Sequence, residues 1–277
     1  MQSRQERRSP TSLSQPSLAT GYYEREDVTM KSITTVTSTI VALALGGIAP
    51  VASAKTTPVG PPTVEVTSRD VAASNAKVKA AYDALINMWS ADFKQIGEQF
   101  AAPRLARYRS PIRTSCGVML PNNAGYCSAD NTVYFDDIFV AAQAKSAARA
   151  LGTDGDMAGL GVIAHEMGHA VAIQLGHESR LSYNNEATAD CLAGAFAQHA
   201  QADKSLEQGD VEEAVFGMSS AGDPTPQLTG NDRVDQRILA RMERVGHGTR
   251  EQRVQNFRNG LQGGAGACLA EFRGMRS

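Results

Sequence analysis

The pattern His165-Glu166-x-x-His169, followed by Glu186 and Asp190, constrains the fold of this chain more than any other feature of the sequence. Residues four apart on an α-helix lie on nearly one face, so His165 and His169 can bind one metal ion together. Glu166 then lies beside the open coordination position of a zinc ion. The pattern predicts a catalytic Zn²⁺ site on a helix, with Glu166 as the general base that activates a zinc-bound water.

The second motif, Glu186-x-x-x-Asp190, supplies the groups that such a site still lacks. A catalytic zinc ion usually has three protein ligands, and Glu186 is the best candidate for the third one. The motif opens a stretch of short side chains, which suits close packing against the histidine helix. Asp190 lies one turn after Glu186 on the same face, and its carboxylate can accept the free ring N–H of a ligand histidine. We therefore expect two packed helices that share the metal site.

Further motifs extend over most of residues 75–272. They are Cys116-Gly117, Tyr126-Cys127, Val133 to Asp136, Ala164 to His169, Glu186 to Gly194, Gly209 to Ala214, Gly222-Asp223, His247 to Gly260 and Cys268. In this order they resemble the putative neutral zinc metallopeptidase family of bacteria. The resemblance implies a zincin-like fold and a zinc-dependent peptidase that acts on a peptide or protein substrate.

The resemblance also gives a role to His247, which lies in a turn before a predicted helix. It implies that His247 stabilises the oxyanion of the tetrahedral intermediate. A structural role for this turn at the start of the helix is the alternative. Tyr183, just before Glu186, is a weaker candidate for the same catalytic task.

The first 54 residues carry the features of an export signal. From Met30, a basic start is followed by an apolar run over 40–49 and a small-residue cleavage site at 52–54. We therefore predict a signal peptide over 30–54, which makes 1–29 an over-extended N-terminus. A long cytoplasmic extension is the alternative for the first segment. An uncleaved membrane anchor is the alternative for the second, although its apolar run is shorter than the ~20 residues of a spanning helix.

Export predicts that the protein is secreted or located in the cell envelope, with no membrane attachment once the signal is cleaved. Without its first 54 residues, the chain keeps 22 basic and 25 acidic residues, a formal charge of −3. No basic stripe remains in this part of the sequence, so nucleic acid is not expected as a partner.

Four cysteines in an exported chain allow two disulfides in three pairings. Cys116 and Cys127 are the favoured local pair and would close a loop rich in Gly, Pro and Asn. Cys191 and Cys268 would then join the C-terminal segment to the helix that carries Glu186. Zinc ligation by cysteine is the alternative, but the sequence has no C-x-x-C spacing.

Hydrophobic periodicity predicts a mainly helical chain with a small sheet. After a linker over 55–74, apolar residues at three- and four-residue steps predict a helix over 75–100, with Trp89 in its packed face. Residues 131–135 have the composition of a strand, and the zincin resemblance implies an edge strand there that pairs with an extended substrate. Residues 104–113 are expected to be a loop. The remaining helices are expected from a cap at Asp154 or Asp156 to about 175, from a cap at Ser182 or Asn184 onward, and over about 206–218, 231–245 and 249–261.

Together these features predict an α+β, mainly helical, zincin-like metallopeptidase domain over 75–277 and a secreted zinc peptidase. Two alternatives remain. One is a secreted zinc-binding scaffold or inactive peptidase-like protein, which would have no use for Glu166 as a base. The other is a zinc amidase that acts on cell-wall peptides.

Overall fold

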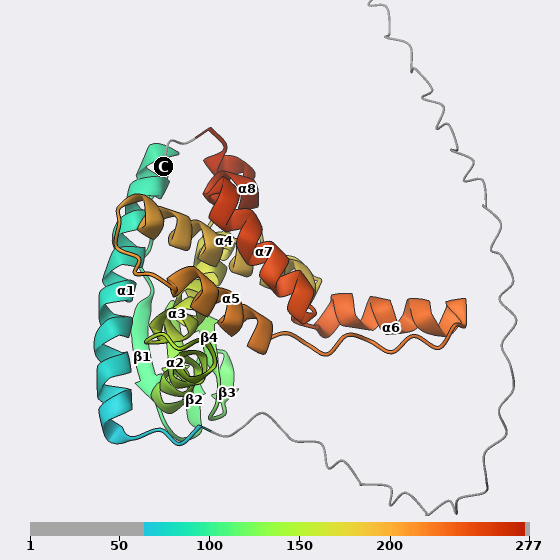
Figure 1. Cartoon of the computed structure of the whole chain (residues 1–277). Helices are drawn as coiled ribbons and strands as arrows, with labels where there is room; N and C mark the ends of the chain where they lie inside the picture. The colour runs from blue at the N-terminus through green and yellow to red at the C-terminus, as the bar shows by residue number, and fades with distance from the viewer. Residues whose placement is uncertain (1–63, 275–277) are drawn as a thin grey trace, which may run out of the picture. The chain divides into compact units, whose positions relative to one another are not determined.

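Figure 1 shows the protein as a computed structural model, which describes residues 64–274. The predicted N-terminal extension (1–29), the signal peptide (30–54) and most of the linker lie outside the described residues. The α+β, mainly helical architecture with a small sheet confirms the predicted fold class. The elements are α1 (Ser68–Gln95), β1 (Arg104–Tyr108), β2 (Ile112–Thr114), β3 (Gly117–Met119), β4 (Ala124–Cys127), β5 (Thr132–Asp136), α2 (Asp137–Leu151), α3 (Asp156–Gln174), α4 (Ser182–Ala202), α5 (Asp210–Ser220), α6 (Asp232–Val245), α7 (Arg250–Gly263), α8 (Ala265–Cys268) and a 3-10 turn (Ala270–Phe272).

The first helix, α1, begins seven residues earlier than its periodicity predicted. The hydroxyl of Thr67 accepts a hydrogen bond from the Asp70 amide at 3.2 Å, and the Asp70 carboxylate accepts one from the Thr67 amide at 2.8 Å. This capping box supplies partners that the first turn of a helix otherwise lacks. The prediction of a linker over 55–74 was therefore wrong for its last seven residues. The helix also ends before residue 100, because the chain turns at Gly97, whose φ is 81°.

Three strands form a sheet in the order β1-β5-β4, with β1 parallel and β4 antiparallel to β5. The strand predicted over 131–135 is confirmed as β5, but its predicted edge position is wrong. Hydrogen bonds to β1 and β4 occupy both of its edges, and its Val133 and Phe135 are buried. The edge that faces α3 belongs to β4. Residues 104–113, expected to be a loop, form β1 and the start of β2, which pairs with β3.

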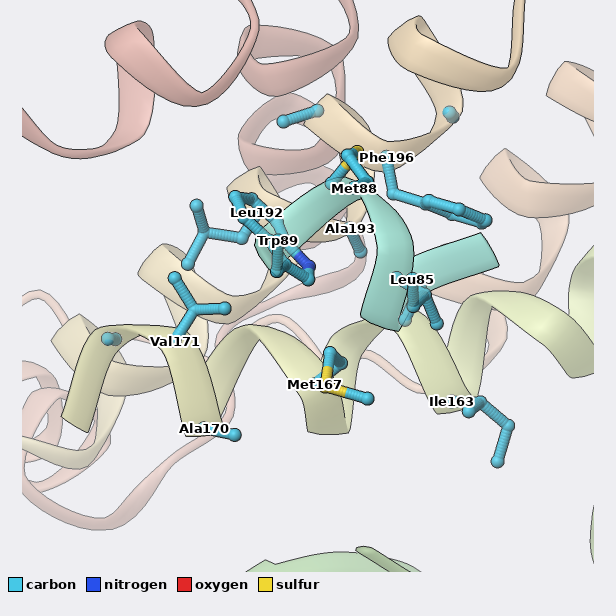
Figure 2. Close-up of a cluster of buried hydrophobic side chains, with 14 of the residues drawn as sticks. Leu85, Met88, Trp89, Ile163, Met167, Ala170, Val171, Leu192, Ala193 and Phe196 are labelled. Carbon is cyan, nitrogen blue, oxygen red and sulfur yellow. The ribbon is translucent and has the colours of Figure 1, made fainter. Parts of the chain in front are cut away.

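The central helix of the core is α3, which contacts α1, α2, α4, α5 and the sheet. Its Met167 and Val171 belong to one buried cluster with Leu85 and Trp89 of α1 and Leu192 of α4 (Figure 2). Trp89 is fully buried, as predicted. Because neighbours surround α3, apolar residues occur on most of its faces. The side chains that α3 carries are therefore held on a firmly packed element.

Small residues let α4 approach both α3 and α7 closely. A Cβ atom at Gly168 of α3 would lie 2.8 Å from the carbonyl oxygen of Ala189 on α4, and one at Gly260 of α7 would lie 1.7 Å from that of Cys191. Real Cβ atoms do not approach backbone atoms so closely, so both glycines are required by the packing. The two motif helices thus pack as the sequence predicted, and α7 also packs against α4.

The two predicted disulfides, Cys116–Cys127 and Cys191–Cys268, are both present. The first closes the segment that contains β3 and the start of β4, and the second joins α4 to α8. The starts of α6 and α7 were predicted to within one residue, since Asn231 and Thr249 are their capping residues. Helix α6 projects beyond the core, and all of its residues are at least partly exposed (Figure 1).

Other helix starts differ from the prediction. Gly155 precedes α3, and within the described chain neither Asp154 nor Asp156 caps it through its side chain. Instead, the buried carboxylate of Glu213 on α5 accepts hydrogen bonds from the amides of Gly155 and Met157, both at 2.9 Å. The predicted capping of α4 by Ser182 or Asn184 is also wrong, since α4 follows Leu181 and its start makes no side-chain cap bond among residues 64–274. The predicted helix over 206–218 begins later, at residue 210, and α2 was not predicted at all.

None of the helices within residues 64–274 has the length and apolar content that crossing a membrane requires.

Candidate metal centre

The three predicted ligands meet where α3 packs against α4. His165 and His169 come from adjacent turns of α3, and Glu186 lies near the start of α4. The Nε2 atoms of the two histidines lie 3.1 Å apart, and carboxylate oxygens of Glu186 lie 3.2 Å from His165 Nε2 and 3.6 Å from His169 Nε2. Two donors bound to one tetrahedral zinc ion at about 2.0–2.2 Å are about 3.4 Å apart. Two imidazoles and a carboxylate at this spacing fit one zinc ion.

Asp190 faces His165 on the side away from the other ligand atoms. Its Oδ1 lies 2.8 Å from His165 Nδ1, and the carboxylate is fully buried. The guanidinium of Arg253 on α7 donates hydrogen bonds to both oxygens of Asp190, at 2.6 and 3.0 Å. A buried chain of polar contacts therefore runs from α7 through α4 to the ligand histidine on α3.

Arg253 was not predicted to belong to the site. Its side chain is only 5% exposed, comes within 3.9 Å of Glu186, and donates to the carbonyl of Ala221 at the end of α5. A signal for it exists in the sequence. Arg253, Phe257 and Gly260 share one helix face by their spacing, and the other two residues suit burial. An arginine on a buried face requires an acidic partner, which here is supplied by the metal centre.

Glu166 faces the same cavity as the ligand atoms without belonging to the ligand group. Its Oε2 accepts a hydrogen bond from the Tyr126 amide of β4 at 2.8 Å. Burial raises the pKa of the Glu166 carboxyl above its usual range, although the charge of His165 opposes this shift. A carboxylate with a raised pKa is better matched to taking up a proton near neutral pH.

The protein groups alone shift the two histidines in opposite directions. Burial opposes protonation of His165, but hydrogen bonds with Asp190 and Glu186 outweigh burial and raise its pKa to about 10. Burial and the charge of His165 lower the pKa of His169 to about 4. Burial favours a protonated Glu186, but the hydrogen bond and charge of His165 lower its pKa to about 2. A zinc ion that binds here must displace a proton from His165, whereas His169 and Glu186 already have their ligand forms at pH 7.

The ligand atoms and Glu166 open into one cavity of about 470 Å³. Its lining residues on α3 recur at three- and four-residue steps from Ala158 to Ile173, so the cavity follows one face of that helix. Residues 123–126 of β4 and its preceding loop also line it. The metal group therefore lies partway along an elongated cavity, between a helix face and the edge of a sheet.

Among the described residues, His247 lines this cavity and Tyr183 does not. The His247 side chain is 58% exposed, and its backbone amide donates to the Asp223 carboxylate at 2.7 Å. The Asp223 amide in turn donates to the carbonyl of Gly248 at 2.8 Å, which fixes the turn. The Tyr183 ring packs against Gly248 instead, where a Cβ atom would lie 2.9 Å from the ring. The geometry therefore favours His247 over Tyr183 as a group that meets a substrate.

A second group of carboxylates surrounds the start of α3. Asp154, Asp156, Asp210 and Glu213 place oxygen atoms within 4.8 Å of one another. Lys77 of α1 contacts Asp154 at 2.5 Å and Asp156 at 2.6 Å, and Glu213 caps the helix. Burial and the neighbouring carboxylates raise the pKa of Asp210 to about 6. These contacts fix the end of the helix that carries the two histidines.

Comparisons with known proteins point to one family. The model of a family described as putative neutral zinc metallopeptidase matches residues 38–272. The uncharacterized protein YpfJ of Escherichia coli strain K12 and that of E. coli O6:H1 are each 35% identical to this chain over 205 residues. Each match covers 66% of this chain and 66% of the relative, so the chain spans about two thirds of the relatives' length. No solved structure matches the chain.

Proposed function

Because the chain belongs to the putative neutral zinc metallopeptidase family, we propose that it is a secreted zinc-dependent peptidase with Glu166 as its general base. One observation carries this proposal. The donor atoms of His165, His169 and Glu186 open into the same cavity as the Glu166 carboxylate. Three protein ligands leave a fourth position of a tetrahedral zinc ion free, as a catalytic site requires. A closed structural site would have no use for a base at residue 166.

The cavity contains the groups that peptide hydrolysis needs. Zinc, when bound, supplies Lewis acidity, which polarises the scissile carbonyl and makes a water molecule easier to deprotonate. Glu166 takes the proton from the water and passes it to the leaving amine. The amide of Tyr126 holds Oε2 of this carboxylate, which leaves Oε1 for the proton. Asp190 holds the ring of His165 so that Nε2 is directed toward the other ligands.

The edge of β4 is suited to binding an extended peptide. In an antiparallel pair, alternate residues direct both backbone groups toward the partner strand. Asn123 does so, because its carbonyl accepts a hydrogen bond from the Asp136 amide, whereas the amide of Tyr126 points to Glu166. By this alternation, both backbone groups of Ala124 and the carbonyl of Tyr126 point away from β5. Hydrogen bonds to these groups would add a substrate strand to the sheet.

His247 is the proposed donor to the oxyanion that forms during hydrolysis. Its side chain lines the cavity and is exposed enough to reach a bound substrate. The Asp223 carboxylate and the Gly248 carbonyl fix the backbone of the turn, so the ring is presented from a defined position. A donor that is fixed before the reaction stabilises the transition state without reorganisation.

The proposed location is outside the cytoplasm. Two disulfides favour an oxidising compartment such as the bacterial cell envelope or the extracellular medium. The signal peptide expected from the sequence agrees with this proposal, and the N-terminus of the mature protein from its host should then lie near Lys55.

Cleavage of a diverse peptide mixture by the purified mature chain tests the proposed function. We expect cuts, read by mass spectrometry, that disappear with a chelator and return with added zinc. Glu166→Gln should retain zinc and the fold but lose cleavage, because an amide cannot accept the proton. Glu212→Gln, which removes an exposed carboxylate on α5, is the matched control and should cut normally. Zinc-loaded protein that cuts no peptide would favour a scaffold, and release of cell-wall peptides alone would favour an amidase.

A further inference from the structure

The two ends of the catalytic cavity differ in chemistry. Resting on the peptidase function proposed above, we propose that one end is a pocket for an apolar side chain next to the scissile bond, so that the substrates are peptides with a residue such as Leu, Met or Phe at that position. Val162 is the side chain proposed to set this preference. The other end of the cavity carries polar groups and imposes no apolar preference.

The apolar end lies toward the N-terminus of α3. Val162 and Ala158 precede Glu166 by one and two turns on the same helix face, which places them about 6 and about 12 Å from it along the axis. Helix α2 contributes Phe139 to this end. All of the side chains that line it lack polar atoms able to form hydrogen bonds with oxygen or nitrogen in the usual way: Phe139, Ala158, Val162, Gly217 and Met218.

The other end lies toward the C-terminus of α3 and is mainly polar. The residues that line it beyond His169 and Ala172 are Ile173, His177, Glu178, Ser182 and Asn185. The imidazole of His177 is paired with Glu271 at 2.8 Å. A substrate side chain at this end can remain hydrated or form hydrogen bonds. The two neighbours of the scissile bond therefore meet different environments.

The floor of the apolar end is firmly packed, and its remaining side chains are only half-buried. Ala158 and Met218 are 1% and 4% exposed. A Cβ atom at Gly217 of α5 would lie 3.1 Å from the Ala158 carbonyl oxygen, so α3 and α5 are in direct contact beneath the pocket. Phe139 and Val162 keep part of their surface exposed. An apolar substrate side chain would cover that surface, which is favourable, whereas a carboxylate would lose hydration without gaining a partner.

The sheet edge can present a substrate side chain to this end. Asn123 pairs with Asp136, which lies three residues before Phe139, so the start of β4 and the apolar end are neighbours. The outward backbone groups of Ala124 follow directly after Asn123. A peptide bound there through its main chain would run beside the pocket, and one of its side chains could enter it.

A series of peptides that differ at one residue tests the proposal. Leu, Ala and Asp are placed in turn on either side of the cut, and kcat/KM is measured with the zinc-loaded mature protein. We expect Leu to exceed Asp by about 10–100-fold on one side only. Val162→Lys should reverse this order, because its ammonium attracts Asp and is incompatible with Leu. Ile173→Lys adds the same charge to the same helix at the other end, and this matched control should keep the preference for Leu.

Binding of labelled peptides to zinc-loaded Glu166→Gln, followed by fluorescence anisotropy, separates this inference from the proposed function. If the wild-type protein cuts no peptide, the peptidase function fails, yet the Leu peptide should still bind about tenfold or more tightly than the Asp peptide. Equal binding of the two peptides, or a preference that Val162→Lys leaves unchanged, would overturn the pocket. If Val162→Lys does not fold, Val162→Thr keeps the shape of the side chain and should weaken the preference for Leu. An unaltered preference in that variant would also overturn the proposal.

Discussion

Replacing Arg253 by methionine should strongly destabilise the protein. Arg253 is 5% exposed and donates two hydrogen bonds to Asp190, which is fully buried. Without the guanidinium, the contact that remains to this carboxylate among the described side chains is with His165. Removal of one partner from a buried ion pair costs about 3–5 kcal/mol. Since about 1 kcal/mol shifts the melting temperature of a domain of this size by about 2–4 °C, we expect a decrease of about 6–20 °C.

The double variant Asp190→Leu/Arg253→Met separates charge burial from the orientation of His165. It removes both charges, and apolar replacement of a buried ion pair is often nearly neutral, so most of the lost melting temperature should return. Zinc affinity should remain about 10–100-fold weaker than in the wild type, because His165 Nδ1 still lacks its acceptor. Circular dichroism melts and competitive zinc titrations measure the two effects. An Arg253→Met protein that melts within about 2 °C of the wild type would refute the reasoning.

Three further changes test separate parts of the molecule. Glu186→Ala should reduce bound zinc from about one ion per chain to nearly none, measured by atomic emission, and undiminished zinc would exclude Glu186 as a ligand. His247→Ala should lower kcat by about a hundred-fold or more at unchanged zinc content, whereas a lower melting temperature with normal kcat would assign His247 to the turn alone. Asp210→Asn should raise the free energy of unfolding at pH 7 but not at pH 4. The folded protein keeps the Asp210 proton up to about pH 6 and the unfolded chain releases it near 3.8, so stability is lost as the pH rises through this window. Equal stability of both proteins at pH 7, measured by chemical denaturation, would contradict this explanation.

The metal centre could be located from the sequence because its spacing is local. His165 and His169 lie one turn apart, and Glu186 and Asp190 repeat that spacing on the next helix, so helix geometry alone places each pair on one face. The short side chains of both helices indicated that they pack together, and Gly168 against Ala189 is the contact that makes this packing close.

Arg253 and Glu213 were missed because their partners are distant in the sequence. Arg253 meets Asp190 across 63 residues, and Glu213 caps α3 across 56–58 residues. Periodicity can show that a charged residue shares a buried face, but not which element it will meet. The order of the strands failed for the same reason. The composition of residues 132–136 identifies a strand, but its central position depends on pairing with β1, 28 residues earlier in register.

Anomalous diffraction at the zinc edge, from crystals of the zinc-loaded protein, tests the central claim most directly. We expect one strong peak between α3 and α4, about 2.0–2.2 Å from donor atoms of His165, His169 and Glu186. The carboxylates at the start of α3 provide an internal comparison, because they are the other group of metal-binding side chain types found close together within residues 64–274. A strong peak at that group, with no density between the two histidines, would contradict the account.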